Sequence, residues 1–241
     1  MSEDVKLFLE NLGDKLRKRN YKPRSFSDIS NFPIAKGQAL YVLDFRENAV
    51  TFQSGIIDLL GYEPDEFTVD FLTNNYHPED YDMVRRLLIA TLTYASENDV
   101  SHQLGYFVTY RIKHKNGHYI KVMRQSNVFD KDEMGQIISN TALLTDISFL
   151  DASNKVQWRF DAPGLDQQKF KEYVSKAYSG FFTERESEII SELKKGRSSI
   201  EISNSLGISK HTVDTHRRKI LQKSNCKNLI ELLNFCAHNG M

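Results

Sequence analysis

The stretch Thr183–Ser224, with the sequence TERESEIISELKKGRSSIEISNSLGISKHTVDTHRRKILQKS, decides the fold of the last part of this chain. Thr183 is followed three residues later by Glu186, and Ser198 is followed in the same way by Glu201. In such a capping box the hydroxyl accepts a hydrogen bond from a backbone amide of the first turn, and the carboxylate accepts one from the capping residue. Each pair therefore predicts the start of a helix.

Glycines and a further serine divide the stretch into three helices. Gly196 and Gly207 stand where a left-handed residue ends each helix, and Ser209 caps a third helix over Lys210–Lys223. The few residues around Gly207 give the second and third helices the spacing of a helix-turn-helix. Apolar residues at helical spacing can form one small core: Ile189, Ile190, Leu193, Ile202, Leu206, Ile208, Val213, Ile220 and Leu221.

The third helix has a basic polar face with Lys210, Arg217, Arg218 and Lys223. Such a helix is narrow enough to enter the major groove of DNA, and its charge attracts phosphate. A lone run of basic residues more often forms only a solvated face. Three capped helices in this order favour DNA binding instead.

The residues that carry a family resemblance are Phe182-Thr-Glu-Arg-Glu-Ser-Glu-Ile-Ile, Gly196, Ile200-Glu-Ile-Ser, Leu206-Gly-Ile-Ser and Thr212-Val-Asp-Thr-His-Arg-Arg-Lys-Ile. Residues 181–241 thereby resemble the all-α, four-helix LuxR-type helix-turn-helix domain of bacterial transcription regulators. Asp214 stands where that family usually has Lys, which removes a common DNA contact. Ser224 stands where it usually has Leu, and we expect looser packing of the third helix on the fourth.

The resemblance implies which residues touch DNA. Those that face base edges are Asp214, Thr215 and Arg218. Those that lie where phosphates run are Lys210, Thr212, His216, Lys223 and Lys227. Arg218 can bind guanine through two hydrogen bonds. Asp214 either accepts a hydrogen bond from the cytosine amino group or only repels phosphate, and the sequence leaves both readings open.

The length of 241 residues suits two modest domains, and charge is distributed unevenly between them. Residues 37–150 carry 9 basic and 16 acidic side chains, a net charge of −7, whereas residues 181–241 carry 10 and 7, a net charge of +3. An acidic middle domain is repelled by DNA while the last domain approaches it.

Several locations and sites are not expected. There is no apolar run near the ~18 residues of a membrane span and no signal peptide at the start, so we expect a cytoplasmic protein. Cys226 and Cys236 form no Cys-x-x-Cys or Cys/His cluster, which predicts neither a zinc site nor a disulfide framework. They are expected to be buried or idle thiols.

Residues 1–36 contain an amphipathic helix and a lead-in. The segment Ser2–Asn20 places Val5, Phe8, Leu9, Leu12 and Leu16 on one helical face. Its last turn is basic, with Lys15, Arg17, Lys18 and Arg19, and Pro23 follows as a break. This helix either packs on its own domain or mediates dimerisation, and both readings stay open.

Residues 37–150 alternate between strand and helix patterns in an order typical of an α+β fold, an antiparallel sheet with helices on one side. The expected strands are Leu40–Phe45, Ala49–Phe52, Gly105–His114, His118–Phe129 and Gln136–Asp146. The spacing of apolar residues predicts helices over Gly55–Leu60 and Asp80–Ala95. Asn116-Gly117 predicts a tight hairpin, because both residues tolerate positive φ.

A second resemblance rests on Leu59-Leu-Gly-Tyr-Glu-Pro-Asp-Glu-Phe, His77-Pro-Glu-Asp, Tyr110-Arg-Ile-Lys-His-Lys-Asn-Gly-His-Tyr-Ile and Thr145-Asp-Ile-Ser. These phrases make residues 37–150 resemble the PAS sensory domains. The resemblance implies either a small ligand or cofactor between sheet and helices, or a dimerisation module.

Two cofactors of PAS domains are not expected, and no cofactor is identifiable. A covalent flavin needs a reactive Cys, which residues 37–150 lack, and a haem usually takes a His from the long helix, which has none. A non-covalent flavin is less firmly excluded, and an unidentified small ligand in the cavity stays open. His114 and His118 straddle the hairpin turn, which we expect to splay them as exposed polar residues. His77, next to Pro78, is expected to stand at the start of a helix and not to be a ligand.

The connector, residues 151–180, has too many aromatic residues for a flexible tether. Val156, Trp158 and Phe160 alternate with polar residues, which predicts a strand, and Pro163-Gly164 predicts a turn. A helix is expected from Asp166 to Tyr178.

The combined patterns predict a dimeric transcription regulator with double-stranded DNA and a second copy of itself as partners, and RNA polymerase as a further candidate. An enzyme is not expected, because no phosphate loop, nucleophile elbow or metal-ligand spacing is present. A receiver domain is not expected either, because alternating strand–helix units are missing. The alternative is a protein–protein adaptor with a degenerate helix-turn-helix, which Asp214 supports.

Overall fold

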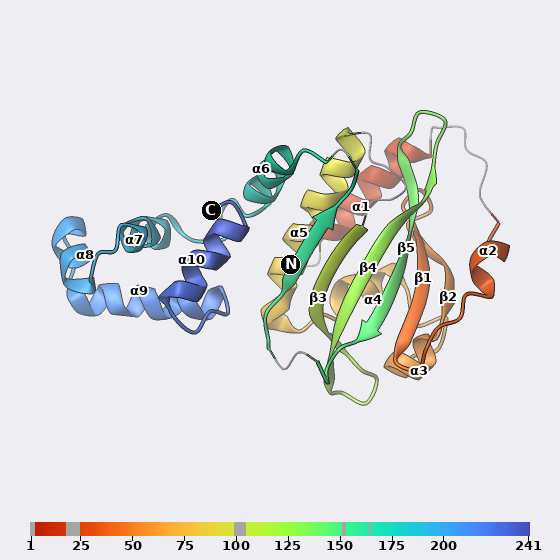
Figure 1. Cartoon of the computed structure of the whole chain (residues 1–241), viewed down its shortest axis with the longest axis horizontal. Helices are drawn as coiled ribbons and strands as arrows, with labels where there is room; N and C mark the ends of the chain where they lie inside the picture. The colour runs from red at the N-terminus through yellow and green to blue at the C-terminus, as the bar shows by residue number, and fades with distance from the viewer. Residues whose placement is uncertain (1–2, 18–24, 99–104, 151–152, 164) are drawn as a thin grey trace. The chain divides into compact units, whose positions relative to one another are not determined.

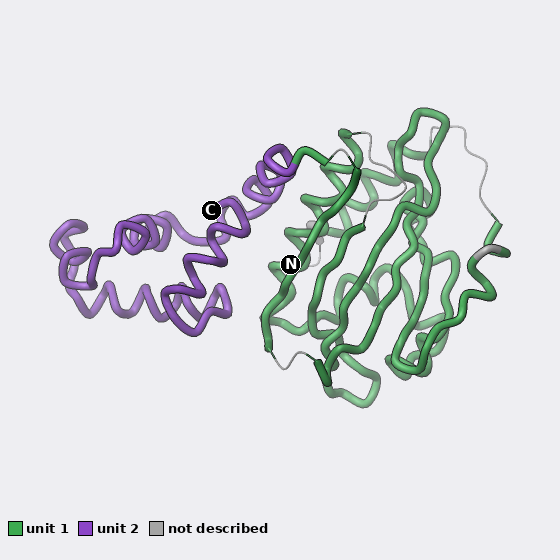
Figure 2. The backbone as a smooth tube through the Cα atoms, in the orientation of Figure 1, with its two compact units in different colours: residues 1–166 green, residues 167–241 purple. Residues whose placement is uncertain are grey.

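The structure is a computed structural model that describes residues 3–17, 25–98, 105–150, 153–163 and 165–241 (Figure 1). The chain divides into two compact units, Met1–Asp166 and Gln167–Met241 (Figure 2). The expected PAS and helix-turn-helix domains lie in different units, and the connector is shared between them. Lys18, Arg19, Pro23 and Gly164, which the sequence analysis interprets, lie outside the described residues.

The first unit is built on an antiparallel sheet. Within the described residues its strands have the order β2-β1-β5-β4-β3-β6 (Figure 1). Their bounds are β1 Gln38–Asp44, β2 Ala49–Ser54, β3 Gly105–Lys113, β4 Tyr119–Lys131, β5 Ile137–Asp146 and β6 Gln157–Asp161. Along β3 the buried residues are Tyr106, Val108, Tyr110 and Ile112, a period of two that turns one face toward the core.

Helices cover that inner face (Figure 1). They are α1 Glu3–Leu16, α3 Ile56–Leu60, α4 Val69–Asn74 and α5 Pro78–Glu97, while α2 Ser27–Ser30 is a short turn of helix. The α+β fold expected from the sequence is confirmed. His77 is confirmed as a helix-start residue, because its Nδ1 accepts a hydrogen bond from the backbone amide of Glu79 at 3.2 Å.

Helix α1 packs within its own unit, against α4 and α5. Val5, Leu9 and Leu16 are buried, whereas Phe8 and Leu12 of the same face are half-buried. Gly13 lies so near the β1–β2 turn that a Cβ atom there would be 2.9 Å from the carbonyl oxygen of Phe45. The reading of a helix packed on its own domain therefore holds, and Phe8 and Leu12 retain surface for a partner.

The β3–β4 hairpin differs from the expected turn. Gly117 has φ of 90°, but Asn116 is not among the residues with positive φ. The backbone amide of Gly117 donates to the carbonyl of His114, and that of His114 donates to the carbonyl of His118, each at 2.8 Å. This is a three-residue loop closed by a left-handed glycine, in which a single residue needs positive φ.

The expectation that the turn splays His114 and His118 is wrong. Their rings stack with centroids 4.6 Å apart, because the longer loop keeps the two residues opposite each other. Burial and the neighbouring His118 lower the pKa of His114. Within the described ranges, no three His, Cys, Asp or Glu side chains gather as a metal site requires.

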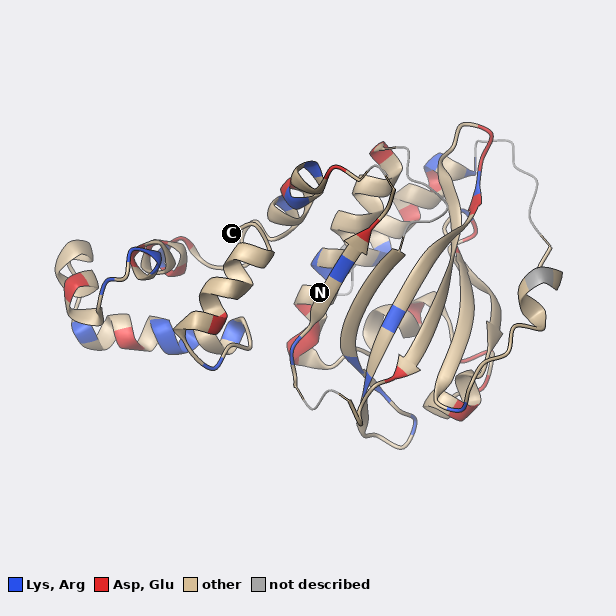
Figure 3. Ribbon diagram, in the orientation of Figure 1, with Lys and Arg blue, Asp and Glu red and all other residues tan. Residues whose placement is uncertain are grey.

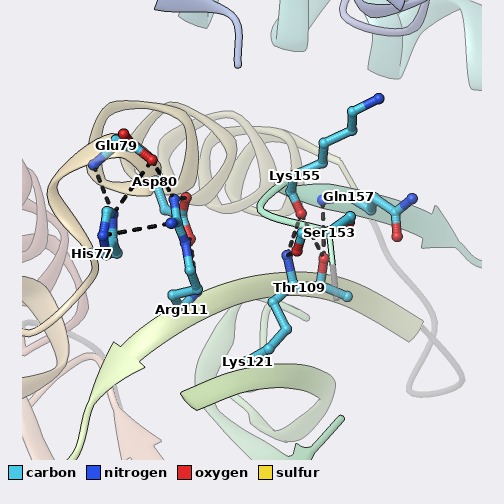
Figure 4. Close-up of polar contacts among 9 residues, drawn as sticks. All are labelled: His77, Glu79, Asp80, Thr109, Arg111, Lys121, Ser153, Lys155 and Gln157. Carbon is cyan, nitrogen blue, oxygen red and sulfur yellow. Dashed lines mark hydrogen bonds and ion pairs between the residues drawn. The ribbon is translucent and has the colours of Figure 1, made fainter. Parts of the chain in front are cut away.

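Two polar clusters fasten the sheet to its surroundings (Figure 4). Arg111 of β3 donates to the buried Asp80 at 2.6 Å and to Glu79 at 2.9 Å, which fixes the start of α5. Lys121 of β4 donates to the carbonyl oxygens of Ser153 and Lys155. The first cluster holds α5 over the sheet, and the second holds the segment that leads into β6.

The expected strand and helix of the connector are both present. Strand β6 pairs antiparallel with β3, with Phe160 opposite Tyr106. Helix α6, Gln167–Ala177, belongs to the second unit, where Phe170 and Val174 are buried. Its Ser175 hydroxyl donates to the carbonyl oxygen of Gly240 at 2.8 Å.

The second unit is helical. After α6 it contains α7 Glu184–Lys194, α8 Ser199–Leu206, α9 Lys210–Lys223 and α10 Leu229–His238. Residues that are 0–2% exposed form its core: Ile189, Leu193, Ile202, Val213, Ile220, Leu232 and Cys236. Cys226 is also buried, and neither thiol forms a disulfide within the described residues. No helix in the described parts of the chain is long and apolar enough to cross a membrane.

Candidate nucleic-acid interface

Both predicted capping boxes form, and they fix the start of α7 and α8. The amide of Glu186 donates to the Thr183 hydroxyl at 3.2 Å, and the amide of Thr183 donates to the Glu186 carboxylate at 2.8 Å. Ser198 and Glu201 make the same pair of bonds. Gly207, with φ of 63°, ends α8 and turns the chain into α9. The helix-turn-helix is thus built by local hydrogen bonds.

Helix α9 is seated by its buried side and by polar contacts with neighbouring helices, among them one from Arg217. Val213 and Ile220 are 0% exposed. Arg217 donates from Nη1 to the Ser199 hydroxyl at 2.7 Å, which joins α9 to the first turn of α8. The sequence predicts Arg217 on the polar face of the helix but does not indicate this positioning role. No local pattern indicates it, because the two residues lie on different helices.

The outward side of α9 carries the expected base-reading residues. Arg218 is exposed and makes no hydrogen bond or ion pair with any described residue, and Thr215 is half-buried. His211 and Gln222 are exposed at the matching helical positions, so all four share one face. Thr215 and Arg218 are among the predicted base-reading residues, whereas His211 and Gln222 are not, although the same helical spacing indicates them.

Asp214 is paired within its own helix. The Lys210 ammonium donates to Asp214 Oδ2 at 2.8 Å, one helical turn away. This hydrogen bond, followed by one from Ser199, lowers the pKa of Asp214. The carboxylate therefore stays charged at neutral pH and offsets the charge of Lys210. Asp214, a predicted base-reading residue, and Lys210, a predicted phosphate contact, are thus joined in one ion pair.

The other predicted phosphate contacts have different surroundings. Lys227 is exposed, and its side chain has no bond to a described residue. Lys223 donates to Glu186 at 3.2 Å and lies 5.9 Å from the ring centres of Phe181 and Phe182. Lys223 therefore also stabilises the fold.

Thr212 and His216 are less open than the lysines. The Thr212 hydroxyl lies 2.9 Å from the Ser209 hydroxyl at the helix start. His216 is half-buried, and its Nδ1 is enclosed without a hydrogen bond to any described residue. Both side chains therefore have less access to a phosphate than Lys227.

The polar surface of α9 is mainly basic (Figure 3). Its cations are Lys210, Arg217, Arg218, Lys219 and Lys223, and Asp214 is its acid. Ser224, at the end of α9, is buried, and its hydroxyl donates to the carbonyl of Ile220 at 2.8 Å. The serine is accommodated by this bond in a position where an apolar residue is common.

Comparison with known families gives two matches in chain order. Residues 49–142 match the PAS fold, and residues 181–236 match the family described as bacterial regulatory proteins, luxR family. The fold and the capped helix-turn-helix agree with these two matches. Residues 49–142 therefore form a PAS domain, and residues 181–236 form a domain of the luxR family of bacterial regulatory proteins.

Individual proteins resemble parts of the chain. The chain is 36% identical over 84 residues to the uncharacterized response regulatory protein YgeK of Escherichia coli K12, and the match covers 34% of this chain. The chain spans about half, 54%, of the length of that relative.

Two solved structures are similar to this chain in fold. The N-terminal domain of a diguanylate cyclase with PAS/PAC sensor from Marinobacter aquaeolei is 21% identical, with a TM-score of 0.40, covering 46% of this chain and 96% of that one. The VqmA dimer of Vibrio cholerae is 16% identical, with a TM-score of 0.37, covering 90% and 89%.

Proposed function

We propose that this chain is a cytoplasmic transcription regulator that binds double-stranded DNA as a homodimer. Its PAS domain receives a signal, and its last domain reads the site. The observation that carries the proposal is the exposed face of α9, where Arg218 has no bond to any described residue. A cationic side chain held outward on the second helix of a helix-turn-helix suits the major groove.

The roles along α9 follow from exposure and charge. Thr215 and Arg218 face base edges, and Lys227 meets phosphate beyond the end of the helix. Asp214 either reads a base or moderates the charge of Lys210. We place the remaining phosphate contacts at Thr212, His216 and Lys223, as the family resemblance implies. Each would require a side chain to move from its present surroundings.

Assembly as a homodimer suits this mode of reading. Two recognition helices one DNA turn apart, ~34 Å, fit a palindromic site. In the first unit, α1 borders an open groove of about 830 Å³ with the end of α5, and Phe8 and Leu12 line it. We propose that α1 and the PAS domain form the dimer contact and that RNA polymerase is the partner at the promoter.

The test is selection of binding sites from a randomised duplex library, followed by anisotropy titrations of the full chain at two salt concentrations. Arg218→Ala should relax preference at one base pair, an effect of about 1–3 kcal/mol. Lys227→Ala should weaken all sequences alike and reduce the salt slope by about one unit. Lys113→Ala, an exposed lysine of β3, is the matched control and should change neither.

An adaptor without DNA binding is the second candidate, and the Lys210–Asp214 pair favours it because it removes one free cation from α9. We expect no catalytic activity in either case. Failure of the chain to retard any genomic fragment in a gel-shift assay would support the adaptor. If the unaltered chain selects a particular duplex and Arg218→Ala no longer prefers that duplex over others, the result would support the regulator.

A further inference from the structure

The PAS domain encloses two small cavities between its sheet and its helices. Each has a volume of about 30 Å³. Leu88, Tyr106 and Arg124 line both, so they are two lobes on either side of one polar group. A lobe of this size is large enough for a water molecule, since one needs about 10–15 Å³. The lobes are far smaller than the ~300 Å³ at which drug-sized pockets begin.

Arg124 is the unusual feature of this cavity. It lies on β4 opposite Val108 of β3, and only 7% of its surface is exposed. Its Nε donates to the Tyr41 hydroxyl at 2.6 Å, and its charge lies 5.7 Å from the centre of the Tyr41 ring. Neither Nη atom bonds to a described residue, and no described carboxylate pairs with it. A buried guanidinium without an anion is costly.

Other polar groups in the lobes also lack partners. Tyr110 is 0% exposed, and its hydroxyl has no hydrogen bond within the described residues. Asn140 Oδ1 is likewise enclosed without one in the second lobe. Buried polar groups are normally satisfied, so such a cluster indicates a molecule that completes it. Arg124 and the Tyr110 hydroxyl offer hydrogen-bond donors and one full positive charge, which call for an acceptor with negative charge, whereas Asn140 Oδ1 is itself an acceptor.

We propose that this cavity binds a small organic acid whose carboxylate accepts hydrogen bonds from Arg124 and from the Tyr110 hydroxyl. A guanidinium presents paired N–H groups that match the two oxygens of a carboxylate. A sensory role for the acid rests on the proposed function, but its binding does not.

The experiment uses the full chain and acetate, an acid small enough for lobes of this size, with acetamide as the neutral control of matched shape. Thermal unfolding and titration calorimetry should show that an acid stabilises and binds the protein and that its amide does not. Arg124→Gln should weaken binding about ten- to a hundredfold, because a charge-assisted hydrogen bond is lost. Tyr110→Phe should weaken it about two- to tenfold.

Tyr62→Phe is the matched control, because Tyr62 does not line either lobe, and it should bind the acid as the unaltered chain does. If Arg124→Gln does not fold, Tyr110→Phe decides. Equal binding of acetate and acetamide, no binding of acetate, or full binding of acetate by Tyr110→Phe would overturn the proposal.

DNA titrations in the same samples separate the two proposals. Acid binding without DNA binding would overturn the proposed function alone. DNA binding by a chain that no acid stabilises would overturn the assignment of the ligand alone. A change in DNA affinity when acid is added, absent in Arg124→Gln, is the result expected if both hold.

Discussion

Replacing Asp214 by Ala tests how the one acid on α9 acts. Asp214 holds the Lys210 ammonium at 2.8 Å, and the two side chains are 44% and 58% exposed. Such an exposed pair contributes at most about 0.5 kcal/mol to helix stability, so the domain should remain folded. If Asp214 moderates charge, its removal frees Lys210 for phosphate and removes a repulsive carboxylate from the interface. The variant should therefore bind every duplex more tightly.

The size of this effect follows from counterion release. Each phosphate neutralised on B-DNA contributes about 0.9 to the slope of log K against log salt. Freeing Lys210 should make that slope steeper by about 0.9. Over a fourfold change in salt concentration, affinity should then fall about 3.5 times more for the variant than for the unaltered chain.

Anisotropy titrations at several salt concentrations measure the slope, and a double-mutant cycle assigns it. In a Lys210→Ala background, the gain from Asp214→Ala should largely disappear. Asp214→Asn keeps a hydrogen-bond acceptor but removes the charge, so it should behave like Asp214→Ala. Loss of preference at one base pair with an unchanged salt slope would refute the reasoning and show that Asp214 reads a base.

Three further predictions concern the cap, the pH response and assembly. Thr183→Ala should lower the free energy of unfolding by about 1 kcal/mol in urea titrations, because the cap of α7 is lost; a change below ~0.3 kcal/mol would contradict this. Burial opposes the charge of Glu186, but bonds from Thr183 and Lys223 lower its pKa below the usual 4.5. Its stabilisation is therefore complete above pH 4.5 and is lost as the pH falls below that value, a loss that Glu186→Gln should reduce in circular dichroism melts. The double substitution Phe8→Asp and Leu12→Asp should shift the protein from dimer toward monomer in sedimentation. An unchanged dimer would place the dimer contact elsewhere.

A last prediction concerns chromophores. Purified protein should absorb no light beyond the protein band, because the Cys and the helix His that covalent flavin and haem need are absent from residues 37–150. A stoichiometric Soret or flavin spectrum would contradict it.

The sequence determines the parts of this protein that depend on neighbouring residues. Thr183 with Glu186, and Ser198 with Glu201, form the boxes that their spacing predicts, because a cap needs only residues three positions apart. The alternating pattern of β3 likewise predicts its buried face. The i,i+4 spacing that permits the ion pair of Lys210 and Asp214 also lies in the sequence.

The turn between β3 and β4 shows where a local pattern is insufficient. Asn116-Gly117 predicts a hairpin, and a hairpin forms, but the loop includes one more residue and only Gly117 adopts positive φ. The register of the two strands sets the loop length, with Lys113 opposite Tyr119. That register depends on packing along the whole hairpin, and it also stacks His114 on His118.

The tertiary structure alone decides the contacts between distant residues. Arg217 reaches Ser199 across two helices, and Arg111 reaches Asp80 across sheet and helix. Arg124 is one basic residue in a strand of mixed pattern, and nothing beside it in the sequence indicates burial. Its guanidinium is enclosed because the pairing of β4 with β3 and β5 turns it inward, beneath helices that are remote in the chain. Burial of a charge is a property of all the atoms around it, which only the folded chain brings together.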